Sequence, residues 1–140
     1  MSDRFFLATN IFVYSFDPAS SRKAKTAAQL IRKALSTQKG IISYQVVQEF
    51  FNVALKRFSR PMAASDAEQY QSTVFRPLLA VHSSHGLFAE ALRLHAANRL
   101  VWYDSMIVAA AVQAQCDLLY SEDLQHGQRF GSLRIENPFL

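Results

Sequence analysis

The sequence predicts an α/β fold built on a mostly parallel sheet. Short apolar runs of the kind that form buried strands recur along the chain. Between them lie longer segments whose apolar residues recur every three or four positions, which is typical of amphipathic helices. This alternation favours an α/β architecture, in which functional groups gather at the carboxyl ends of the strands. The 140 residues are predicted to form one domain, 1–140, because they contain no repeat, linker or low-complexity stretch.

The first predicted strand is Phe5–Leu7, a short apolar run. Residues 10–16 are rich in β-branched and aromatic side chains and could form either a strand or a helix. A serine pair at 20–21 then offers a helix start, and residues 21–38 carry one apolar stripe at helical spacing. Gly40 is expected to stop this helix.

A second strand is predicted at Ile41-Ile42, and a helix with apolar residues at three–four spacing starts at Ser43 and ends before Pro61. Residues 65–68, Ser-Asp-Ala-Glu, match a capping box, in which the Ser and Glu side chains satisfy free amides at a helix start. That helix is expected to run toward Arg76, because Pro77 disfavours helical backbone at the residue before it.

The last part of the chain continues the alternation. Residues 78–82 are a short strand candidate, residues 84–98 have helical spacing, and residues 103–115 predict an Ala-rich helix. Leu118–Tyr120 is a strictly apolar strand candidate, and residues 133–135 form the last predicted strand.

The composition is that of a globular domain, since half of the residues are hydrophobic and only 19% are charged. The formal net charge of +4 and the sequence pI of about 9.5 favour an anionic partner such as nucleic acid or an acidic protein. Several basic residues could hold a nucleic-acid backbone, although a solvated charge is the simpler interpretation of each one singly. These residues are Arg22, Lys23, Lys25, Lys56, Arg57 and Arg60.

Cys116 is the lone cysteine, so an internal disulfide and a thiolate zinc cluster are excluded. It lies in an apolar run and is expected to be a small core residue. No apolar run approaches the roughly 18 residues needed to span a bilayer, and the N-terminus has no extended apolar signal region. We therefore expect a cytoplasmic protein.

Four of the 11 acidic residues stand beside apolar elements. Glu49 lies inside an apolar helix, Asp104 precedes the Ala-rich helix, and Glu122 and Asp123 follow the strand Leu118–Tyr120. Carboxylates in such places are costly to desolvate unless a cation or a metal pairs with them, and Mg²⁺ prefers their oxygen atoms. One interpretation is a metal site. The alternative is that Asp104 caps its helix, Glu49 points to solvent and Asp123 makes a turn.

Four segments in register resemble the motifs of PIN-domain nucleases. Residues 6–14 resemble the first motif, a hydrophobic strand ending in Asp-Thr-Asn, and Ser43 with Glu49 resembles the second. Residues 103–111 resemble the third, an aspartate opening an Ala-rich helix, and residues 118–124 resemble the fourth, an apolar strand followed by Ser and then an aspartate. Together the four cover nearly the whole chain, and the sequence is most similar to the VapC-type toxins of toxin–antitoxin pairs.

The resemblance implies a PIN-like three-layer α/β/α sandwich, with a central mostly parallel sheet and helices on both faces. It also implies an endoribonuclease that needs Mg²⁺ or Mn²⁺. Carried over by position, Glu49, Asp104 and Asp123 are the expected catalytic and metal-binding carboxylates. The expected supporting residues are Thr9, Asn10 and Ser121. An antitoxin partner and a homodimer follow from the same resemblance.

The departure from the family pattern is Ala8, which stands where the family has an aspartate. A methyl group cannot bind a cation, so Ala8 is expected to leave the chain nearly inactive. Either the chain is an engineered inactive form or it is a naturally degenerate member. Engineering is the favoured interpretation, because the rest of the site is intact and an active ribonuclease toxin is hard to produce in a living host.

Other residues near the predicted site have more than one interpretation. Trp102 and Tyr103 could stack on a base, although core packing is favoured for both. His126 follows Asp123 by three residues and could approach the site. The aromatic residues Phe5, Phe12, Phe50, Phe51 and Phe58 could serve a core or an interface.

Three alternative functions remain open from the sequence. The chain could be a PIN-fold binding module without catalysis, in which Ala8 is native. It could be a PIN nuclease with a housekeeping role in RNA or DNA processing. It could also be an unrelated α/β domain whose acidic residues are scattered by chance, in which case Glu49, Asp104 and Asp123 would lie far apart.

Overall fold

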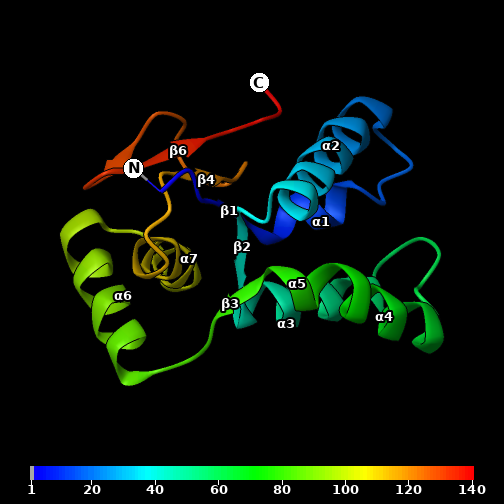
Figure 1. Ribbon diagram of the computed structural model, residues 1–140, viewed down its shortest axis with the longest axis horizontal. Helices are drawn as coiled ribbons and strands as arrows, with labels where there is room; N and C mark the ends of the chain where they lie inside the picture. The colour runs from blue at the N-terminus through cyan, green and yellow to red at the C-terminus, as the bar shows by residue number, and fades with distance from the viewer. Residues whose placement is uncertain (1) are drawn as a thin grey trace.

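The computed structural model describes residues 2–140, and in this part of the chain six strands form one sheet in the order β3-β2-β1-β4-β6-β5 (Figure 1). Adjacent strands are parallel except for β5, which is antiparallel to β6. The sheet is therefore mostly parallel, as the sequence predicted. The strands are β1 Phe5–Leu7, β2 Gly40–Ser43, β3 Leu79–Val81, β4 Leu118–Tyr120, β5 Arg129–Phe130 and β6 Leu133–Glu136.

Helices connect the parallel strands and cover both faces of the sheet. In Figure 1, α6 and α7 lie on one side of the sheet, and α1 and α2 lie on the other. The α/β class and the three-layer PIN-like architecture are thereby confirmed. The helices are α1 Thr9–Tyr14, α2 Ser21–Thr37, α3 Tyr44–Ala54, α4 Ala64–Tyr70, the π-helical turn η1 Gln71–Phe75, α5 Arg76–Leu78, α6 His85–Asn98 and α7 Trp102–Gln113.

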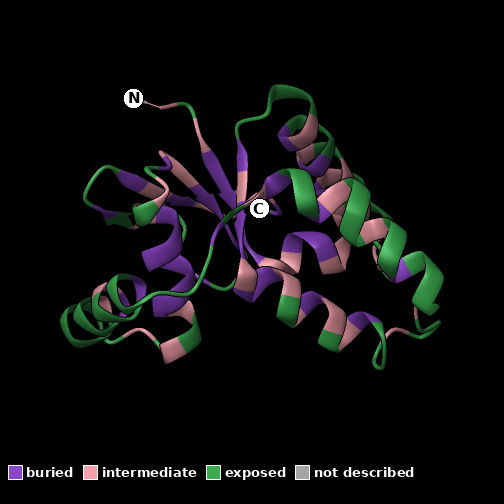
Figure 2. Cartoon of the chain, turned by 60° about the horizontal axis from the view of Figure 1, so that its bottom comes forward, coloured by how far each residue is buried: buried purple, intermediate pink, exposed green. Residues whose placement is uncertain are grey.

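The central strands are buried on both faces, which explains their uninterrupted apolar sequences. Figure 2 shows that the strands and most of α7 are buried, whereas α2, α4 and α6 are largely exposed on their outer sides. Phe5, Phe12 and Phe50 lie in the core, and the ring of Phe50 contacts those of Phe58 and other neighbours. Cys116 is buried, as expected, and burial raises the pKa of its thiol to about 12.

Residues 9–14 form a helix, which settles the ambiguity of the second apolar run. Helix α2 is capped by Ser20, whose hydroxyl accepts a hydrogen bond from the amide of Lys23. The helix ends at Thr37, where Gln38 adopts a left-handed backbone. Gly40 was therefore wrongly predicted as its stop. Gly40 is the first residue of β2, and a Cβ built on it would lie 2.2 Å from the Cβ of Ala34, so close packing requires glycine here.

Two further predictions were wrong at α4. The helix begins at Ala64 with Ala63 as its N-cap, so Ser65 lies inside the helix and no side chain caps its start. The helix also does not stop before Pro77. It widens into η1 and continues as α5, which contains Pro77 near its start. Arg76, the residue before Pro77, keeps a helical backbone, and its amide donates to the carbonyl of Gln71 across the wider π-helical turn.

The sequence analysis also missed β5. With only two residues, Arg129 and Phe130, it has no periodicity to detect, and it exists because it pairs with β6 across a tight turn. Among the described residues, no helix combines the length and apolar character needed to cross a membrane.

Candidate functional site

The candidate site lies where β1 and β4 end side by side. The amide of Ala8, which follows β1, donates a hydrogen bond of 3.1 Å to the carbonyl of Tyr120, the last residue of β4. The residues that follow both strands therefore meet at one edge of the sheet. This edge carries the carboxyl ends of the parallel strands, where α/β folds place their functional groups.

A small cavity of about 70 Å³ opens at this edge. It brings together all three carboxylates predicted from the sequence, the three predicted supporting residues and the methyl group of Ala8. Its walls come from β1–α1, α3, α7 and the loop after β4. The residues that line it are Ala8, Thr9, Asn10, Gln45, Glu49, Tyr103, Asp104, Ile107, Ser121, Asp123 and Leu124.

Two neighbours hold the carboxylate of Glu49. The hydroxyl of Thr9 donates to its Oε1 at 2.6 Å, and the Nε2 of Gln45 donates to its Oε2 at 3.3 Å. The same Nε2 donates to the carbonyl of Tyr103 at 3.1 Å, so Gln45 links α3 to α7. Glu49 therefore points into the site and not to open solvent.

Sequence reasoning missed Gln45. Its side chain is buried, and its Oε1 has no hydrogen-bond partner among the described residues. The signal that could have found it is its spacing, because Gln45 precedes Glu49 by four residues and thus lies beside it on one helix face. A buried amide oxygen without a partner is rare in folded proteins, and here it belongs to a residue that lines the cavity.

The loop after β4 positions Asp123. The Nδ2 of Asn10 donates to its Oδ2 at 3.1 Å, and the Oγ of Ser121 accepts a hydrogen bond of 3.2 Å from its amide. The Oδ1 of Asn10 also accepts from the amide of Glu122 at 3.5 Å. Asn10 and Ser121 thus shape the turn that presents Asp123.

Asp104 lies in the first turn of α7, which begins two residues before it. Burial raises the pKa of its carboxyl, and the negative charges of Asp123 and Glu49 raise it further. A raised pKa means that the folded protein is less stable with the Asp104 carboxylate ionised than it would be if this group were solvated. The carboxylates of Asp123 and Glu49 therefore repel that of Asp104 across the cavity.

No cation neutralises this cluster within the described chain. The ion pairs of residues 2–140 join Lys23 to Glu122, Arg93 to Glu90 and Arg134 to Glu136, and none of them reaches the cavity. The same residues contain no three His, Cys, Asp or Glu side chains gathered closely enough to hold a metal ion. The carboxylates line one cavity without closing around one point, and a methyl group occupies the wall at position 8.

Glu122 does not belong to this cluster, although it is a neighbour of Asp123 in sequence. Lys23 pairs with its carboxylate at 2.6 Å, and the hydroxyl of Tyr14 donates to it. These hydrogen bonds, first that of Lys23 and then that of Tyr14, lower the pKa of Glu122. Lys23, one of the basic candidates from the sequence, is thereby engaged in the fold.

Two other sequence interpretations need correction. Tyr103 is not packed in the core, since 64% of its surface is exposed at the rim of the cavity, whereas Trp102 is half-buried against the core as expected. His126 does not line the cavity. The Nδ1 of His126 accepts a hydrogen bond of 3.0 Å from the amide of Asn137, which directly follows β6, so this bond holds the imidazole at the end of β6.

Solved structures share this fold at low sequence identity. A toxin–antitoxin complex from Klebsiella pneumoniae is 18% identical, with a TM-score of 0.67, over 95% of this chain and 96% of its own. VapBC2 from Rickettsia felis, bound to a DNA fragment from its promoter, is 20% identical with a TM-score of 0.60, over 95% and 97%. VapC20 from Mycobacterium tuberculosis, a sarcin-ricin loop cleaving toxin, is 18% identical with a TM-score of 0.55, over 82% and 86%.

No curated protein matches the sequence significantly. Residues 5–129, however, match the family model of the PIN domain, which is most of the chain. The match extends from the first strand to the fifth, so it includes every residue of the acidic cavity. An unrelated α/β domain is therefore excluded, and the chain belongs to the PIN domain family.

Proposed function

We propose that this chain has the architecture of a metal-dependent endoribonuclease, the toxin of a toxin–antitoxin pair, and that Ala8 disables it. The observation that carries the proposal is the cavity in which Glu49, Asp104 and Asp123 meet without a neutralising cation. Burial raises the pKa of Asp104, and the charges of Asp123 and Glu49 raise it further, which is unfavourable for stability alone; in a PIN domain this favours a positively charged ligand.

The donor set fits a divalent cation of the magnesium type. Carboxylate oxygens are the ligands that Mg²⁺ and Mn²⁺ prefer, and three carboxylates line the cavity. The set lacks the oxygen ligand that an aspartate at position 8 would supply. We infer that a cation binds this chain weakly, and that Glu49, Asp104 and Asp123 would hold it.

When bound, a divalent cation polarises a phosphodiester and lowers the pKa of a coordinated water molecule. The residues of the chain prepare the site for this chemistry. Thr9 and Gln45 orient Glu49 by donating to its two oxygens, and Asn10 orients Asp123. Tyr103, exposed at the rim, is placed to stack on a base of a single-stranded RNA.

The toxin assignment rests on the structural neighbours, which include toxins in complex with their antitoxins. By analogy, an antitoxin would bind this chain and block the cavity. The exposed side chains of Phe88 and Leu92, four residues apart on one face of α6, would serve a homodimer. Analytical sedimentation tests this homodimer: the unchanged chain should sediment as a dimer and the Leu92→Glu variant as a monomer.

Cleavage of RNA by the Ala8→Asp variant tests the proposed activity. The expected result is Mg²⁺-dependent cleavage by Ala8→Asp, and cleavage lower by about a hundredfold or more in the unchanged chain, because a missing metal ligand weakens and misplaces the ion. The matched control is Ala8→Asn, which has nearly the same size without the charge. A second control, Ala8→Asp combined with Asp104→Asn, is expected to lose the activity again.

If the folded Ala8→Asp variant cleaves no RNA with either Mg²⁺ or Mn²⁺, the nuclease proposal is wrong. The chain would then be better described as a PIN-fold binding module, in which Ala8 is native. A nuclease that cleaves RNA but has no antitoxin partner would instead favour a housekeeping role in RNA processing.

A further inference from the structure

A second hollow lies at the opposite edge of the sheet from the acidic cavity. Phe5 and Leu118, the first residues of β1 and β4, line it, whereas Ala8 and Ser121 line the acidic cavity beyond the other ends of these strands. Three residues of extended strand span about 10 Å, so the two sites are separate. The hollow has a volume of about 660 Å³ and is open to solvent.

Basic residues outnumber acidic residues in the lining of the hollow. Its lining includes five cationic residues and two acidic ones, in a chain whose formal net charge is +4. Among the described residues, Arg134 is the one cation of this lining that forms an ion pair. The cationic residues are Arg4, Lys33, Lys39, Arg129 and Arg134, and the acidic residues are Asp3 and Asp117.

The β5–β6 hairpin places two of these cations directly opposite each other. Arg129 and Arg134 are paired across the antiparallel strands, so their side chains project from the same face. Like charges in this position destabilise a sheet unless an opposite charge lies between them. Glu136, at 3.3 Å from Arg134, offsets part of this repulsion, and it does not pair with Arg129. The repulsion that remains between Arg129 and Arg134 favours binding of an anion at this face.

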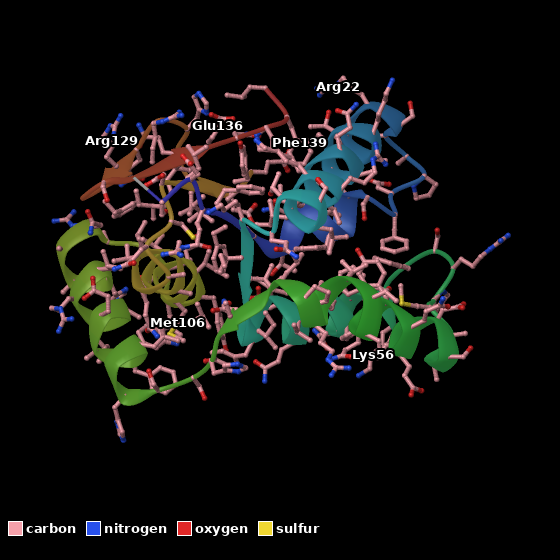
Figure 3. All side chains as sticks on the ribbon, viewed as in Figure 1. Arg22, Lys56, Met106, Arg129, Glu136 and Phe139 are labelled. Carbon is pink, nitrogen blue, oxygen red and sulfur yellow. The ribbon has the colours of Figure 1, made fainter. Side chains whose placement is uncertain are left out.

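The other cations of the lining come from other segments, and Arg4 is held by its guanidinium, which donates to the carbonyl of Ala114 and to the Oε1 of Gln115. Lys33 comes from the last turns of α2, with its Nζ 5.1 Å from the centre of the Phe5 ring, and Lys39 precedes β2. Lys33, Lys39 and Arg129 are all exposed, so they are distributed over a surface and do not enclose a small molecule. Figure 3 shows Arg129 near the outer end of the hairpin, far from Arg22 and Phe139.

We propose that this basic hollow is a second nucleic-acid site, which binds the phosphates of a strand that runs along the hairpin and past α2. Exposed cations from separate segments suit a chain of phosphates, since each one neutralises a different phosphate and releases its counterions. The proposal does not depend on ribonuclease activity, because binding at this surface needs neither the acidic cavity nor a metal.

The test is binding of a fluorescent single-stranded RNA oligonucleotide to the unchanged chain in EDTA, which prevents a divalent cation from bridging the RNA to the acidic cavity. The variant is Lys33→Gln with Arg129→Gln, two exposed positions whose substitution leaves the core intact. The matched control is Arg32→Gln with Arg76→Gln. It removes the same charge from exposed residues that do not line the hollow and form no ion pair among the described residues.

The expected result is an affinity roughly tenfold lower for the Lys33/Arg129 variant than for the control. The slope of log affinity against log salt should decrease by about 1.4, which corresponds to two lost phosphate contacts on a single strand. Equal losses in the two variants would overturn the proposal, because they would reflect net charge alone.

A measurement on the unchanged chain removes any dependence on folding of the variants. Amide chemical shifts are followed while the oligonucleotide, or inorganic pyrophosphate, is added. The proposal expects the oligonucleotide to shift the amides of Lys39, Asp117 and Ser132. Shifts caused by pyrophosphate alone would identify a site for a small phosphate compound and contradict a nucleic-acid site, as would shifts confined to the acidic cavity.

Discussion

The Ala8→Asp substitution should destabilise the metal-free protein, and this effect can be measured without any RNA. Ala8 is buried, and its methyl group lines the same cavity as Glu49, Asp104 and Asp123. A fourth carboxylate in this place has no cation to pair with, since no ion pair of the described chain reaches the cavity. The repulsion that already raises the pKa of Asp104 would therefore increase.

The size of the effect follows from the cost of burying a charge without a partner, roughly 1–3 kcal/mol in a partly solvated site. For a domain of this length, about 1 kcal/mol lowers Tm by roughly 3–5 °C, so the expected decrease is roughly 3–15 °C. Magnesium should reverse it. A cation present at about 100 times its Kd stabilises the form that binds it by about 2.7 kcal/mol.

The assay is thermal unfolding followed by circular dichroism, in EDTA and in MgCl₂, for the unchanged chain, Ala8→Asp and Ala8→Asn. The Asn variant has the steric cost of the larger side chain without its charge, so the difference between the two variants isolates the electrostatic term. If both variants melt at the same temperature in EDTA, and magnesium raises both equally, the carboxylates do not form one electrostatic cluster and the reasoning is refuted.

Three other substitutions test individual parts of the structure. Asp104→Asn should raise Tm slightly at pH 7, and the gain in the free energy of unfolding should be less than about 1 kcal/mol because the side chain is partly solvated. Since the pKa of Asp104 is raised in the folded protein, this gain should shrink as the pH falls through that pKa, and a gain that persists in acid would contradict the prediction. Glu122→Gln should lower Tm at neutral pH, because it removes the ion pair with Lys23. Since the pKa of Glu122 is lowered in the folded protein, the difference in Tm between the variant and the unchanged chain should disappear as the pH falls through that lowered pKa. Gly40→Ala should cost about 1–3 kcal/mol in urea unfolding, since its Cβ would overlap that of Ala34, and an unchanged midpoint would show that the two segments can separate freely.

Local pattern was sufficient to predict the main elements of the fold. The strand at 118–120 was predicted with its observed bounds, because its apolar run is short and polar residues flank it. Helix boundaries were predicted less well. Glycine and proline both disfavour helices in isolation, but neither Gly40 nor Pro77 ends a helix here, because packing against Ala34 and the π-helical turn determine the local backbone.

The candidate site shows the same division. Glu49, Asp104 and Asp123 could be selected from the sequence because carboxylates are conspicuous beside apolar elements. Their shared cavity then follows from the parallel order of β1 and β4. The part played by Gln45 could not be selected in this way, since an amide within a helix is unremarkable until its neighbours are known.

The sequence by itself therefore determined the alternation of strands and helices, the PIN-domain motifs and the absence of an aspartate at position 8, because these depend on the order and type of neighbouring residues. Only the tertiary structure decided that Glu122 pairs with Lys23 while Asp123 does not, and that five basic residues from separate segments line one hollow. The physical reason is that charge interactions depend on distance in space, which residue order does not specify for segments that are far apart in the chain.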